Sequence, residues 1–136
     1  MASKKTMQYY EPGLHNVGSY QVAGTPFITG SVTQAADTQQ KVSFPTVTKS
    51  VTVINHASQT IRIHFTDKDE GNTVQGLHFI ELDSDEDSFT FGVKCQEIYI
   101  STPSGNSGAA AWKLYAELTH IPASRMYNLT GSGLTD

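Results

Sequence analysis

The stretch Thr60–Thr66, TIRIHFT, alternates apolar and polar residues with a period of two along its length. Successive side chains of a β-strand point to opposite faces, so this alternation is typical of a strand with one buried face. It predicts an inner set of Ile61, Ile63 and Phe65 and an outer set of Arg62 and His64. The period therefore indicates a half-buried strand, and helical spacing is absent.

The same period recurs on both sides of this stretch, between clusters of Gly, Asn, Asp, Ser and Pro that are typical of turns. Repeated short strands at this spacing favour an all-β fold, an antiparallel β-sandwich that is jelly-roll-like, with about eight strands. The predicted strands lie in GSYQVAGTPFITG (18–30), QQKVSFP (39–45), SVTVINH (50–56), TIRIHFT (60–66), GLHFIEL (76–82), SFTFGV (88–93), QEIYIST (96–102) and AAAWKLYAEL (109–118).

Three aromatic residues are predicted to lie on the inner faces of the sandwich, namely Phe89, Phe91 and Trp112. Cys95 is the only cysteine, so no internal disulfide can form. Because it sits in a strand-like stretch, we expect a buried, unreactive thiol.

The length of 136 residues indicates a single domain. We divide the chain into an N-terminal arm (1–17), a β-sandwich domain (18–121) and a C-terminal arm (122–136). At the start of the second arm, IPASRMYNL (121–129) is the one helix candidate, with Pro122 suited to a first turn.

Apolar side chains stand out in both arms, which otherwise consist largely of small and polar residues. They are Tyr9, Tyr10, Met126, Tyr127 and Leu129. Either each arm folds back over its own sandwich, or it reaches a neighbouring subunit. Aromatic anchors are enriched at interfaces, so we predict that these five residues bind a partner.

The acidic stretch Glu81–Phe91, ELDSDEDSFTF, raises the question of a metal site. A calcium loop of the EF-hand type that started at Asp83 would need Gly at position six and Glu at position twelve. Ser88 and Lys94 occupy those positions. We therefore interpret the stretch as a hairpin turn with solvated carboxylates, and predict no metal site.

Catalytic motifs are also missing from the sequence. Neither a Gly-x-Ser-x-Gly elbow nor a phosphate-binding glycine loop is present. A metal-binding cupin would need a His-x-His pair, whereas this chain offers only His64, His78 and Glu81 at unsuitable spacing. The sequence predicts no enzyme and no cofactor, with a cupin-like metalloenzyme kept as a remote alternative.

Charge and hydropathy argue against nucleic acids and membranes as binding partners. Nine basic and thirteen acidic residues give a net charge of -4, which disfavours a nucleic-acid partner. No apolar run approaches the ~20 residues of a membrane span. The N-terminus has no apolar core of a signal peptide, so we expect neither membrane insertion nor secretion.

Four stretches carry a resemblance to a known group of proteins. They are NVGSYQVAGTPFITGS (16–31), FPTVTKSVTVIN (44–55), EDSFTFGVKCQEIYIS (86–101) and RMYNLTGSGLTD (125–136). From Gly18 onward the chain resembles small virion structural proteins of tailed marine phages, especially those that infect cyanobacteria.

The resemblance implies a structural role in the virion and supplies no functional residues, because such proteins work through surfaces. It predicts a capsid decoration (cement) protein that binds between major capsid subunits and stabilises the phage head. Its expected partners are the major capsid protein and neighbouring copies of itself, in a homo-oligomer or multi-copy assembly. The alternative is a neck, tail or fibre-base component of the same virion.

Overall fold

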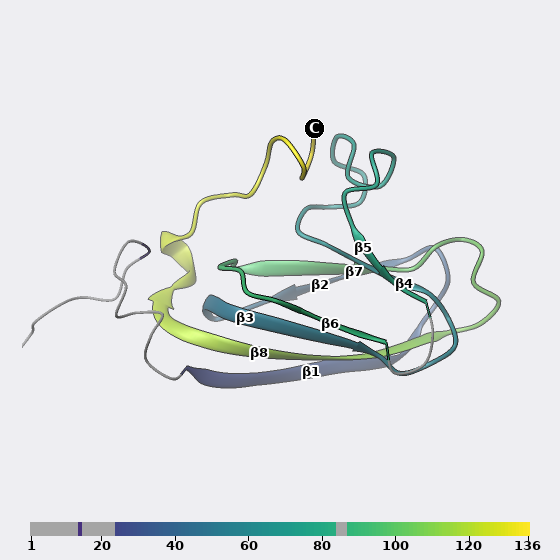
Figure 1. Ribbon diagram of the computed structural model, residues 1–136, viewed down its shortest axis with the longest axis horizontal. Helices are drawn as coiled ribbons and strands as arrows, with labels where there is room; N and C mark the ends of the chain where they lie inside the picture. Colours follow the sequence, from purple (N-terminus) through teal and green to yellow (C-terminus); the bar gives the residue numbers. More distant parts are fainter. Residues whose placement is uncertain (1–13, 15–23, 84–86) are drawn as a thin grey trace, which may run out of the picture.

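The computed structural model describes residues 14, 24–83 and 87–136 and consists of two antiparallel four-stranded sheets packed face to face (Figure 1). The predicted all-β sandwich of about eight strands is confirmed. The strands are β1 (Thr25–Gln34), β2 (Gln39–Ser43), β3 (Thr46–Asn55), β4 (Ile61–His64), β5 (Ile80–Leu82), β6 (Ser88–Phe91), β7 (Glu97–Ser101) and β8 (Ala110–Pro122), followed by the 3₁₀ turn η1 (Ala123–Arg125).

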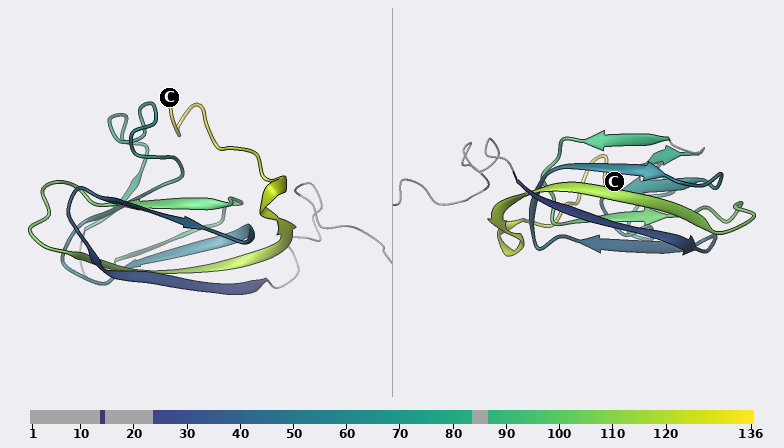
Figure 2. Two further views of the ribbon diagram at one scale, coloured as in Figure 1. Left: turned by 180° about the vertical axis from the view of Figure 1, so that it is seen from behind. Right: turned by 90° about the horizontal axis from the view of Figure 1, so that it is seen from below.

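The strand order is that of a jelly roll. Sheet A has the order β1-β8-β3-β6 and sheet B has the order β2-β7-β4-β5. Among the described strands, only β4 and β5 are neighbours both in the chain and in a sheet, and every other connection crosses between sheets. Two interleaved four-stranded sheets of this kind define the jelly-roll architecture (Figure 2).

This topology corrects the prediction that the acidic stretch is a hairpin turn. The segment between Leu82 and Ser88 joins β5 in sheet B to β6 in sheet A, so it bridges the two layers. The short linker between β3 and β4, which also has hairpin length, crosses between the sheets as well. Residues 84–86 of the acidic stretch lie outside the described part of the chain.

The main core lies between the sheets, and a buried glutamine connects its two layers. Trp112 of β8 donates its indole N–H to Oε1 of Gln34 over 2.7 Å. Nε2 of Gln34 in turn donates to the carbonyl of Ile100 in β7 over 2.9 Å. The predicted burial of Phe91, Trp112 and Cys95 is confirmed.

The prediction that Phe89 is buried is wrong. Phe89 pairs with the inward-facing Val53, so it lies on the inner face as expected. However, β6 is the last strand of sheet A, and 43% of the Phe89 surface stays exposed. An edge strand has a neighbour on one side only, so an inward side chain there can still reach solvent.

A second, smaller core lies where β8 ends. It is formed by Val47, Ile121 and Met126, with Leu14 and Leu129 packed against it. The helix candidate in this region is reduced to the single turn η1, which begins after Pro122. Met126 therefore belongs to the fold of the domain itself.

Candidate functional site

The outer face of sheet B is covered by two segments that are distant in the sequence. One is the excursion 65–79 between β4 and β5, and the other is the C-terminal segment 127–136 (Figure 1). They meet above the sheet, and the chain ends beside the excursion. Sheet B thus carries a partial third layer.

Hydrogen bonds fix the end of the chain to the excursion. The carbonyl of Leu134 accepts from the Thr73 hydroxyl at 3.1 Å and from Nδ1 of His78 at 3.2 Å. The Asn72 N–H donates to the carbonyl of Thr135 at 2.7 Å. A Cβ at Gly71, which has a φ of +56°, would overlap that carbonyl, so a glycine is required at this approach.

His64 lies beneath this third layer. As predicted, it points to the outer face of sheet B, where its ring stacks on Tyr99 with centroids 5.9 Å apart. The side chain is nevertheless buried, because the third layer covers this face. Nδ1 contacts the carbonyl of Thr66 at 2.6 Å, and Nε2 contacts Oγ of Ser101 at 2.8 Å. Because a carbonyl only accepts, Nδ1 carries the proton and Nε2 accepts from the hydroxyl. His64 is therefore a satisfied structural residue.

Lowering the pH is expected to destabilise the fold through His64. Burial lowers the pKa of His64 below its ordinary value of 6.5, because the imidazolium would lose hydration. The unfolded chain then binds this proton at higher pH than the folded chain does. The contribution to stability is complete above the unfolded pKa and decreases as the pH falls below about 6.5.

The measurement is the melting temperature as a function of pH in wild type and two matched variants. We expect His64→Gln to be less stable at neutral pH but to lose less stability on acidification. His120→Gln replaces a histidine on an exposed position of β8 and should keep the wild-type pH profile. An unchanged profile in His64→Gln would contradict this assignment.

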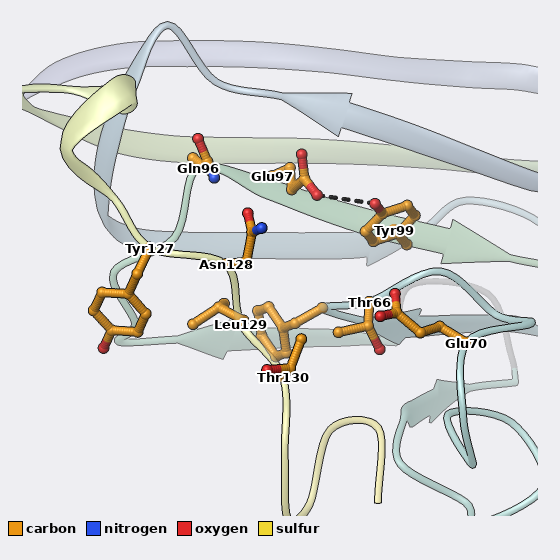
Figure 3. Close-up of a pocket in the computed structure, with 10 residues that line it drawn as sticks. Thr66, Glu70, Gln96, Glu97, Tyr99, Tyr127, Asn128, Leu129 and Thr130 are labelled. Carbon is orange, nitrogen blue, oxygen red and sulfur yellow. Dashed lines mark hydrogen bonds between the residues drawn. The ribbon is translucent and has the colours of Figure 1, made fainter.

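A small pocket opens between the third layer and β7 (Figure 3). Its volume is about 200 Å³, below the roughly 300–1,000 Å³ of typical small-molecule pockets. It is lined by Phe65, Thr66, Glu70, Gln96, Glu97, Tyr99, Tyr127, Asn128, Leu129 and Thr130. Aromatic rings, amides, hydroxyls and two carboxylates thus surround a narrow space without Lys or Arg.

Two of the polar groups that line this pocket are bound to each other. Tyr99 donates its hydroxyl to Glu97 at 2.9 Å (Figure 3). Lys41 pairs with the same carboxylate at 3.1 Å. Burial, followed by the contact with Glu97, raises the pKa of Tyr99, so its phenol stays protonated. The lining contains no His, Cys, Ser or Lys, and its possible bases and nucleophiles are the Glu, Thr and Tyr side chains. The pocket can hold a small polar group.

The outer face of sheet A contrasts with that of sheet B, because no described segment lies over it (Figure 1). Ile28 and Val32 of β1 are 72% and 76% exposed, and Tyr115 of β8 is 39% exposed. Ile28 pairs with Tyr115, which pairs with Thr52 on the far side. These residues form an open surface with apolar groups on neighbouring strands, which we call the sheet A face.

The predicted partner-binding residues differ in their exposure. Met126 is buried at 6% exposure, and Leu129 is half-buried against both cores, so these two fold back onto their own domain. Tyr127 is 59% exposed at the rim of the pocket. Tyr9 and Tyr10 lie outside the described residues.

Sequence reasoning missed the sheet A face. The segment around β1 is predicted as a strand, but its outward side is not evident, because Phe27 and Ile28 are adjacent apolar residues that break the alternation. One feature of the sequence could have pointed to this face: residues 12–36 contain no Asp, Glu, Lys or Arg. A strand within such an uncharged stretch is a candidate for contact with another surface.

Comparisons with known proteins do not assign the chain to a group. Neither a family model, nor a curated protein, nor a solved structure matches it. Over the part of the chain that the structure describes, no three His, Cys, Asp or Glu residues gather to hold a metal ion. In the same residues, no helix is long and apolar enough to cross a membrane.

Proposed function

We propose that this protein is a capsid decoration (cement) protein of a tailed phage, a non-enzymatic structural protein that binds between major capsid subunits. The observation that carries the proposal is the sheet A face, where Ile28 and Val32 are largely exposed and Tyr115 is partly exposed. Exposed apolar groups gathered on one face mark surfaces that bind another protein.

Two further features support a binding role over a catalytic one. The jelly roll is a fold of viral capsid proteins, although it also occurs in lectins and cupins. In the pocket between the third layer and β7, the carboxylate of Glu97 is engaged by Tyr99 and Lys41. The resemblance of four stretches to virion proteins points in the same direction.

The proposal is tested by locating the protein on purified particles and by adding it to heads that lack it. We expect gold-labelled antibody to mark the head surface in many copies. We also expect wild-type protein to bind the deficient heads and raise the temperature at which they release DNA. Labelling confined to the neck or tail would overturn the decoration role in favour of the alternative component, and absence from the particle would overturn both.

A further inference from the structure

β1 is an edge strand without the charged residues that usually protect a sheet edge. It lies at the end of sheet A, with β8 on one side and no described strand on the other. Its sequence, TPFITGSVTQ, contains no charged residue. Exposed edges usually carry charges, most often lysine, that discourage pairing with another chain. Both edge strands of sheet B carry a charge, Lys41 in β2 and Glu81 in β5.

The outward residues of β1 form a pattern that is symmetric about Gly30. Ile28 and Val32 lie two residues to either side, and both are more than 70% exposed. Together with Gly30 they line a shallow cavity of about 260 Å³. A Cβ at Gly30 would lie 2.6 Å from the carbonyl of Trp112, so only glycine fits there and the gap between the two aliphatic side chains persists.

We propose that two copies of this protein pair through β1, antiparallel and about a two-fold axis at Gly30. In this register Gly30 faces Gly30 of the second copy, and Ile28 of each copy faces Val32 of the other. The two four-stranded sheets then join into one eight-stranded sheet with a continuous outer face. Main-chain hydrogen bonds supply the affinity, as in other cases of strand addition, and two aliphatic cross-strand pairs set the register.

A second copy fits this edge because a two-fold interface must be complementary to itself. Bringing two identical strands together would cost electrostatic energy if they were charged, and these are not. The pairing segment is bounded at both ends: Pro26 lacks an N–H to donate, and the register with β8 shifts between Ser31 and Gln34. Val32 thus marks one end of the segment. The dimer goes beyond the proposed function and does not depend on it.

Cysteine cross-linking of the full chain tests the register. Opposed residues of antiparallel strands have Cα atoms about 4.5–5.5 Å apart, within the range that a disulfide spans. Positions 28 and 32 of one chain are about 13 Å apart, too far for an internal bridge. We expect Ile28→Cys/Val32→Cys to form a covalent dimer on mild oxidation. Each single variant should stay uncross-linked, because its thiol faces an aliphatic side chain and the native Cys95 is buried.

Paired charge variants test the same contact in solution by analytical ultracentrifugation. Ile28→Lys/Val32→Lys places lysine opposite lysine twice, and we expect its dimer dissociation constant to rise at least about tenfold. Ile28→Lys/Val32→Glu has the same number of substitutions but places lysine opposite glutamate, so its constant should stay within a few-fold of wild type. Both positions are exposed, and thermal melts check that the variants fold.

Three results would overturn the proposal. The first is a wild-type protein that remains monomeric at about 1 mM. The second is cross-linking of the single cysteine variants as efficient as that of the double variant. The third is equal dimerisation of the two charge variants. None of these would bear on whether the protein decorates a phage head, which is measured on the particle.

Discussion

Replacing Trp112 with alanine is expected to lower the free energy of unfolding by about 3–5 kcal/mol. The side chain is buried between the two sheets, so its removal leaves a cavity that the surrounding β-strands cannot close. It also removes the donor that satisfies Gln34, whose Oε1 is then buried without its partner. The measurement is urea unfolding followed by circular dichroism, since Trp112 is the only tryptophan and its fluorescence is lost in the variant.

Two further variants separate the contributions. Trp112→Phe retains most of the ring but not the N–H, so we expect a smaller loss of about 1–3 kcal/mol. Tyr115→Ala removes an aromatic residue from the outer side of the same strand, and should cost about 1 kcal/mol or less. If Trp112→Ala were no more destabilising than Tyr115→Ala, the assignment of Trp112 to the core would be wrong.

Met126→Ala is expected to destabilise the isolated protein by about 2–5 kcal/mol. Met126 is nearly fully buried in the second core, in contact with Val47 and Ile121. If this residue acted mainly as a partner-binding anchor, its truncation would leave the isolated domain unaffected. Equilibrium unfolding of the purified chain, without any partner, therefore distinguishes the two roles.

The adjacent Tyr127 provides the matched control. Because it is 59% exposed, Tyr127→Ala should change the free energy of unfolding by no more than about 0.5 kcal/mol. A partner role for the C-terminal segment would instead reduce attachment of this variant to deficient heads. Equal destabilisation by Met126→Ala and Tyr127→Ala would contradict the division of the segment into a buried and an exposed anchor.

The strands and their inward sides could be predicted from the sequence. In TIRIHFT and AAAWKLYAEL the alternation places Ile61, Ile63, Trp112 and Leu114 toward the core, and all four are buried. This works because the pleated backbone fixes a period of two whatever the surrounding fold. The method fails for the β1 segment. Apolar residues lie on both of its sides, so the alternation does not show which side stays exposed.

The alternation could not predict which strands pair with one another or which segments cover the outer faces of the sheets. A short polar linker suits either a hairpin or a crossing between sheets, so the position of β5 and β6 in different layers depends on the whole topology. The residues of the C-terminal segment have no period to interpret, and their burial depends on where the segment docks.

Two residues show the difference between what the sequence determines and what the tertiary structure determines. Alternation places His64 outward and Phe89 inward, and both directions are observed, yet His64 is buried and Phe89 is half exposed. The direction of a side chain is a local property that the backbone period fixes. Its exposure depends on which segment packs on it, and here the contacts that decide it join residues as distant as Thr66 and Leu134, 68 positions apart.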